Sequence, residues 1–129
     1  MRPVRLVLLV VAGLLAVAAC SSSATSSPGG ATASSAAPTA IHVRDFTLDP
    51  LAVSSTGGSI SLAVTNDGPT IHNVTIRDSK GTIIAATKDL QPGTSETLST
   101  KIAPGSYILF CSLPGHESLG IKGTLTVSP

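Results

Sequence analysis

Turn residues divide most of this chain into segments that are too short for stable helices. Clusters such as Thr56-Gly-Gly58, Asn66-Asp-Gly-Pro69 and Ala103-Pro-Gly105 separate the segments. Within the segments apolar and polar residues alternate, most clearly in Ser59–Thr65. A period of two is typical of a strand that buries one face. Short strands separated by glycine and proline, with no helical period, predict an all-β fold: a β-sandwich of seven to eight strands.

The expected strands all lie after residue 40. In one of them His72 shares a face with Val74 and Ile76, so the alternation predicts that the histidine points into the core. The predicted strands are Ile41–Leu48, Leu51–Val53, Ser59–Thr65, Ile71–Arg77, Thr82–Thr87, Ser95–Ile102, Gly105–Cys111 and Ile121–Val127.

Three side chains could bind one metal ion together. Cys111 and His116 stand at the two ends of the loop Cys-Ser-Leu-Pro-Gly-His, and His72 lies 39 residues before the cysteine. One thiolate and two imidazoles are the ligand set of a blue-copper site. The soft thiolate suits Cu(I), and imidazole suits both oxidation states. The pattern therefore predicts one copper ion, cycling between Cu(I) and Cu(II), bound by His72, Cys111 and His116.

Other interpretations fit the same residues less well. A lone cysteine or histidine on an inward face is commonly a core residue. A structural zinc ion would lack a fourth ligand. Cys111 and His116 could form a nucleophile–base pair, but the sequence offers no orienting carboxylate and no oxyanion pocket. We therefore expect no enzymatic activity.

The N-terminal residues predict export and membrane attachment. Arg2 and Arg5 precede the apolar run Leu6–Ala19, as in a signal peptide. Val17-Ala-Ala-Cys20 resembles the end of a bacterial lipoprotein signal, which implies a lipid on the Cys20 sulfur. Lipidation would leave Cys111 without a disulfide partner. The expected division is residues 1–20 as the lipoprotein signal, 21–39 as a flexible Ser/Ala-rich tether and 40–129 as the copper-binding domain.

Charge and aromatic content argue against nucleic acid as a partner. Of eight Lys and Arg residues, six remain once Arg2 and Arg5 are removed, against seven Asp and Glu, so the mature chain is near neutral. No basic run is interleaved with aromatic residues. The scattered charges, Asp45 and Glu117 among them, are expected on a solvated surface, and His42 is expected to be a solvated strand residue.

The order of motifs resembles that of the cupredoxins, the plastocyanin-like small blue-copper proteins. The shared features run from Asp-Phe in the first strand through Asn-Asp-Gly-Pro-Thr-x-His-Asn to Cys-Ser-x-Pro-Gly-His and a closing Gly-Thr-Leu-Thr-Val. The resemblance implies a Greek-key β-sandwich with copper near one end and His72, Cys111 and His116 as its ligands. It also implies that Asn73 directs its backbone amide at the thiolate and its side chain at Ser112.

The axial methionine of that family has no counterpart here. Its position falls on Ile121, and Met1 is the only methionine in the sequence. We therefore expect a site with three strong ligands and a raised reduction potential. The hydrocarbon of Ile121 would occupy the axial side.

The resulting interpretation is a monomeric electron-transfer protein, lipid-anchored on the extracytoplasmic face of the cell membrane. Its redox partners would dock briefly near His116. The alternative is a copper carrier or buffer that delivers the metal to another cuproenzyme. A third interpretation, a cupredoxin-like binding module without metal, conflicts with the presence of all three strong ligands.

Overall fold

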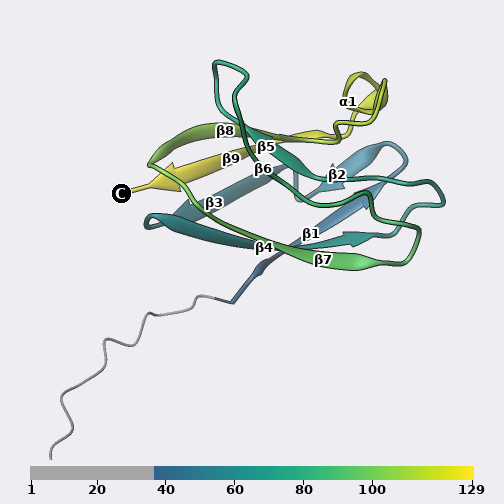
Figure 1. Ribbon diagram of the computed structural model, residues 1–129, viewed down its shortest axis with the longest axis horizontal. Helices are drawn as coiled ribbons and strands as arrows, with labels where there is room; N and C mark the ends of the chain where they lie inside the picture. Colours follow the sequence, from purple (N-terminus) through teal and green to yellow (C-terminus); the bar gives the residue numbers. More distant parts are fainter. Residues whose placement is uncertain (1–36) are drawn as a thin grey trace, which may run out of the picture. The chain divides into compact units, whose positions relative to one another are not determined.

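The computed structural model describes residues 37–129, which form two β-sheets packed face to face (Figure 1). One sheet has four strands in the order β2-β1-β4-β7, and the other has five in the order β3-β9-β8-β5-β6. The predicted β-sandwich is confirmed, with nine strands instead of seven or eight. The strands are β1 (Thr39–Arg44), β2 (Thr47–Asp49), β3 (Ala52–Thr56), β4 (Ser59–Asn66), β5 (Thr75–Arg77), β6 (Ile83–Ala86), β7 (Ser95–Lys101), β8 (Gly105–Phe110) and β9 (Lys122–Ser128).

Alternation along the strands builds a core between the two sheets. In β4 every second residue is buried, and β9 shows the same pattern. Two parallel pairings, β1 with β4 and β3 with β9, join strands that are distant in sequence. The largest fully buried apolar side chains come from both sheets and the adjoining segments: Ile41, Leu48, Leu62, Ile76, Leu109, Ile121 and Leu125.

The first predicted strand, Ile41–Leu48, is in fact two antiparallel strands, β1 and β2. They pair Val43 with Leu48, so both apolar residues still face the core and the alternation hides the reversal. The chain turns at Asp45 and Phe46. At this turn the Asp45 carboxylate forms hydrogen bonds with Thr70 and His72.

The segment around His72 is also less regular than predicted. Only Thr75–Arg77 forms a strand, while His72 makes an isolated antiparallel bridge with Leu90. The inward orientation of His72 is confirmed, because its side chain is fully buried. Asn73, expected on the opposite face, is buried as well, since the loop after Cys111 covers it.

A single turn of helix, α1 (His116–Leu119), follows the cysteine loop and was not predicted. Four residues cannot establish a helical period in the sequence. Gly115 enters the helix at φ 83°, a left-handed conformation that glycine adopts without steric cost. Within residues 37–129, the helical structure is far too short to cross a bilayer.

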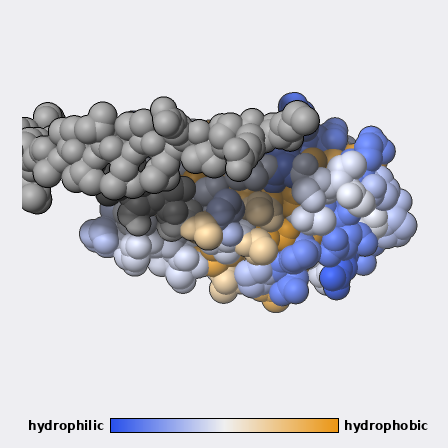
Figure 2. Space-filling model, turned by 90° about the horizontal axis from the view of Figure 1, so that it is seen from below, coloured by the Kyte–Doolittle hydropathy of each residue, from blue (hydrophilic) through white to orange (hydrophobic). Residues whose placement is uncertain are grey.

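Most surface charges lie in solvent, as the scattered pattern predicts. Figure 2 shows one face of the molecule, on which hydrophilic residues gather toward the right-hand end and hydrophobic ones lie nearer the middle. The large apolar side chains that remain exposed are Phe46, Leu51, Ile71, Ile83 and Leu119. Of these, Phe46 packs edge-on against the rings of His72 and His116.

Candidate metal centre

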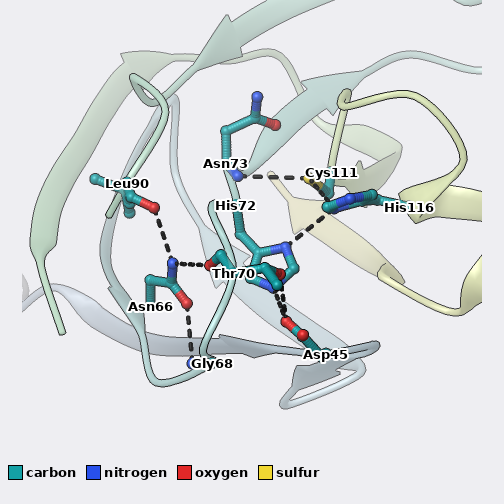
Figure 3. A network of polar contacts seen from close by, with 9 residues as sticks. All are labelled: Asp45, Asn66, Gly68, Thr70, His72, Asn73, Leu90, Cys111 and His116. Atoms are coloured by element: carbon teal, nitrogen blue, oxygen red, sulfur yellow. Dashed lines mark hydrogen bonds and ion pairs between the residues drawn. The ribbon is translucent and has the colours of Figure 1, made fainter. Parts of the chain in front are cut away.

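The structure brings the three predicted ligands together. One donor atom from each of His72, Cys111 and His116 lies within 4.8 Å of the others. The two imidazole Nδ1 atoms are 3.1 Å apart, and the Cys111 Sγ is 3.5 Å from the His116 Nδ1 (Figure 3). His72 and Cys111 are buried, and His116 is partly exposed. Among the described residues, this is the group of histidine, cysteine and carboxylate side chains that could hold a metal ion.

Each ligand comes from a different element. Cys111 directly follows β8, and His116 begins α1. His72 lies between β4 and β5, where its backbone exchanges two hydrogen bonds with Leu90, at 3.2 and 2.7 Å. The six residues from Cys111 to His116 therefore fix two ligands locally, whereas the third is brought in by the fold.

The loop that carries His72 is organised by Asn66, whose side chain is fully buried. Its amide donates to the carbonyls of Thr70 and Leu90, at 2.7 and 2.8 Å, and its Oδ1 accepts from the Gly68 amide at 2.9 Å (Figure 3). A buried amide with all these partners satisfied holds one loop conformation, because breaking any bond leaves a polar group unpaired. The Asn66 side chain thus fixes the loop that positions His72.

Asn73 lies as the cupredoxin resemblance implies. Its backbone amide points at the Cys111 Sγ at 3.5 Å, within the limit for a sulfur acceptor. Its Oδ1 accepts from the Ser112 amide at 2.8 Å, and its Nδ2 donates to the Ser112 hydroxyl at 3.0 Å. A further bond from Nδ2 reaches Asp89 at 2.8 Å. Asn73 therefore ties the His72 segment to the cysteine loop.

The donor geometry fits a soft or borderline metal ion. Nitrogen and sulfur ligands lie about 2.0–2.3 Å from an ion such as zinc, so two donors on one ion are roughly 3–4 Å apart. Both measured separations fall in this range. A separation of 3.1 Å between the two Nδ1 atoms suits either a hydrogen bond between the rings or two lone pairs directed at one cation. A thiolate with two imidazoles favours copper among first-row metals.

Comparison with known proteins decides the family. A model of the cupredoxin-like domain matches residues 8–127, which is most of the chain. The chain belongs to the cupredoxin family. In this cupredoxin the match extends over both sheets and all three candidate ligands.

Individual relatives agree with that assignment. Auracyanin-B from Chloroflexus aurantiacus is 45% identical over 47 residues, a match that spans 36% of this chain and only 20% of the relative. The crystal structure of dithionite-reduced auracyanin from Roseiflexus castenholzii has 28% identity and a TM-score of 0.65, covering 73% of this chain and 98% of that chain. An azurin from Methylomonas sp. strain J has a TM-score of 0.63, covering 73% of this chain and 100% of that chain. At 20% identity this azurin shares the fold alone.

The backbone of Ile121 forms hydrogen bonds with both ligands of the cysteine loop. Its carbonyl accepts from the Cys111 amide at 3.2 Å, and its own amide donates to the His116 carbonyl at 3.1 Å. Its side chain is fully buried in the core of this cupredoxin. The role of the side chain stays a prediction.

Two residues at the site carry no ligand signal in the sequence. The Asp45 Oδ1 lies 2.5 Å from the His72 Nε2 and accepts from the Thr70 hydroxyl at 2.6 Å. The bond from Thr70, followed by that from His72, holds the pKa of the Asp45 carboxyl below its ordinary value. The ring of Phe46 meets His116 edge-on, with centroids 5.5 Å apart. In the sequence, the turn between β1 and β2 is marked only by the pair Asp45-Phe46 inside an alternating segment.

Asp45 is an exposed residue, as expected, although its carboxylate also bonds to His72. The expectation that Glu117 is a solvated surface charge is wrong. Glu117 is only partly exposed and forms a two-pronged ion pair with Arg77, at 2.8 and 2.5 Å. This pairing with Arg77 lowers the pKa of Glu117. The guanidinium of Arg77 also stacks over Phe110 at 4.2 Å. The ion pair therefore joins helix α1, which begins at His116, to strand β5.

His42 is half-exposed, as expected, but it is not free. Its Nδ1 lies 2.7 Å from the Asp67 carboxylate, which Arg44 also contacts at 3.2 Å. The bond from His42, and after it that from Arg44, lowers the pKa of Asp67. Cys20, the predicted lipidation site, lies outside the described residues, as do the predicted signal and most of the tether.

Proposed function

We propose that this chain is a single-copper electron-transfer protein with a type 1 (blue) site formed by His72, Cys111 and His116. The observation that carries this proposal is the convergence of one buried sulfur and two imidazole nitrogens on one point of a rigid β-sandwich. Copper bound there would supply a reversible one-electron couple. The chain itself would hold the donors in place and limit the access of water.

Rigidity of the donor set favours fast electron transfer. The ligands are held by hydrogen bonds from Asn73 and Leu90 and, around helix α1, by the ion pair of Arg77 with Glu117. Such a scaffold leaves the donors little room to rearrange when the charge at the site changes. A thiolate and two imidazoles tolerate both oxidation states of copper.

The exposed edge of His116 is the proposed point of contact with redox partners. His116 is partly exposed, whereas Cys111 is 1% exposed. Apolar side chains lie near it in the chain and in space, with Phe46 36% exposed against its ring and Leu119 58% exposed in the same helix. A small apolar surface of this kind suits brief, weak docking.

Addition of Cu(II) to the purified domain should produce an intense visible band that saturates at one equivalent. The band should disappear on reduction and return on reoxidation, because the site is proposed to hold copper in both states. Absorption spectroscopy with cyclic voltammetry measures both properties. Zinc bound stoichiometrically in preference to copper, with no colour, would contradict the proposal.

The same titration separates electron transfer from the second candidate, a copper carrier or buffer. A carrier must release its metal, so a competing chelator should remove copper within minutes. An electron-transfer protein should retain copper through many oxidation cycles. The burial of two of the three ligands favours retention.

We also propose that Cys20 carries a lipid and that residues 21–39 tether the domain to the membrane surface. The support is the Val17-Ala-Ala-Cys20 sequence with its preceding apolar run and the serine-rich residues that follow. A tether of this kind would raise the effective concentration of the domain near membrane partners.

Changing Cys20→Ala should move the protein from the membrane to the soluble fraction, or leave it unprocessed. Two acyl chains give stable attachment, and the variant has no sulfur to accept them. Labelling with a palmitate analogue and detergent partitioning would measure the change. A neighbouring change, Ser21→Ala, is the matched control and should leave the fractionation unaltered. Wild-type protein that is unlabelled and freely soluble would contradict the anchor alone and would leave the copper proposal standing.

A further inference from the structure

Both ring nitrogens of His72 face polar partners. Its Nδ1 faces the other two candidate ligands, and its Nε2 faces a carboxylate, the Oδ1 of Asp45 at 2.5 Å (Figure 3). The imidazole is fully buried, while the Asp45 side chain is 22% exposed. In the described part of the chain, no carboxylate bonds to the ring of His116. The two histidines are therefore supported differently.

The contacts of Asp45 decide which nitrogen of His72 carries the proton. The Thr70 hydroxyl has one proton, and that proton points to Asp45 at 2.6 Å because an ionised carboxylate can only accept. The same carboxylate oxygen faces Nε2, so the proton of that bond must belong to the ring. In the neutral ring this contact selects the Nε2–H tautomer, whose Nδ1 lone pair is directed at the ligand cluster.

The fold builds this contact from two distant segments. Asp45 lies at the turn between β1 and β2, and His72 lies in the loop after β4. The loop lies against this turn, with the Asp67 amide donating to the Val43 carbonyl at 2.9 Å. Gly68 leaves the space that the carboxylate needs, because a Cβ at that position would lie 2.9 Å from the Asp45 Oδ1.

We propose that Asp45 is a positioning residue for the metal site: its carboxylate fixes the tautomer and orientation of His72 and adds negative charge behind that ligand. The proposal rests on the proposed function, because it assigns His72 Nδ1 to copper. Carboxylates that accept from the far nitrogen of a ligating histidine raise the basicity of the ligand. A more basic ligand and a nearby negative charge both stabilise Cu(II) more than Cu(I), because Cu(II) carries the higher charge. Asp45 therefore lowers the reduction potential of the site.

The tautomer can be tested in the metal-free protein. In wild type, nitrogen-15 NMR of the histidine rings should show His72 as the Nε2–H form with a slowly exchanging ring proton. Asp45→Ala should give a mixture of tautomers and lose the slow proton. Asp45→Asn should keep the Nε2–H form, because the amide oxygen still accepts. Asp67→Asn, a neighbouring carboxylate that bonds His42 and Arg44 instead, is the control and should leave His72 unchanged.

Copper binding then separates the charge from the hydrogen bond. Asp45→Ala should weaken Cu(II) binding by about 10–100-fold, the usual effect of removing such a partner. Cu(I) binding should weaken less, and each tenfold difference between the two states raises the potential by about 59 mV. Asp45→Asn should raise the potential while the tautomer stays fixed. Asp67→Asn should change neither quantity appreciably, because its charge is already paired with His42 and Arg44.

Two results would overturn the positioning role. One is a folded Asp45→Ala protein in which His72 keeps the Nε2–H form and the slow proton. The other, decisive if Asp45→Ala does not fold, is an Asp45→Asn protein whose potential matches that of Asp67→Asn. Wild-type protein that binds no copper, but whose His72 tautomer depends on Asp45, would overturn the proposed function while supporting this role in the apoprotein.

Discussion

Changing Cys111→Ser should abolish the visible band of the copper-loaded protein, leaving essentially none of the wild-type absorption. The band is expected from charge transfer between thiolate and Cu(II), and a serine hydroxyl stays protonated where a metal-bound thiol gives up its proton. Cys111 is 1% exposed, and serine fits the same space, so the backbone conformation should not change. The Asn73 amide, 3.5 Å from the sulfur, can turn to the new oxygen. Absorption spectra of both proteins at equal copper loading measure the effect.

Two controls separate colour from folding and from metal retention. His72→Ala should keep a thiolate-based band where copper remains bound but should lose copper far more readily, because it removes the ligand outside the loop. Ser118→Ala lies in helix α1, directly after the cysteine loop, and removes a bond to the Gly115 carbonyl at 2.7 Å, so its spectrum should match wild type. A Cys111→Ser protein that remained as blue as wild type would show that this sulfur does not bind the copper.

Changing Ile121→Met should lower the reduction potential of the copper site. A thioether sulfur near the metal stabilises Cu(II) more than Cu(I), whereas isoleucine offers only hydrocarbon and excludes water. A tenfold gain in the relative stability of Cu(II) lowers the potential by about 59 mV, and we expect a fall of at least that size. The backbone of Ile121 already bonds to Cys111 and His116, so the new side chain starts close to both ligands. Cyclic voltammetry on the two proteins measures the shift.

Leu125→Met is the matched control for that experiment. Leu125 is on β9, is fully buried like Ile121, and tolerates a methionine of similar volume. It should leave the potential and the spectrum unchanged. If Ile121→Met also changed neither, position 121 would not face the copper, and its side chain would serve only the core beside Leu125 and Val127.

The strands could be predicted because their signal is local. Alternation in Ser59–Thr65 follows from a pleated backbone with one face in water, and the structure has β4 at Ser59–Asn66. The same rule failed at Ile41–Leu48, since a tight reversal between Val43 and Leu48 preserves the alternation on both sides. It also missed α1, because one turn of helix is held by the Gly115 conformation and by tertiary contacts of Glu117.

The sequence by itself determined the donor set of this cupredoxin. Cys111 and His116 are joined by a loop too short to separate them, and His72 is marked by its own inward alternation and by Asn73. The chemistry of one thiolate and two imidazoles then restricts which metal ion the site prefers. Only the tertiary structure decided which residues hold the ligands in place. These contacts are the hydrogen bond of Asp45 with His72, the ion pair of Arg77 with Glu117 and the aromatic contact of Phe46 with His116. Each pair joins segments separated in sequence, and charged or aromatic residues at turns look the same in a sequence whether they face water or a ligand. The free energy of those contacts depends on burial and distance, which exist only once both sheets have packed.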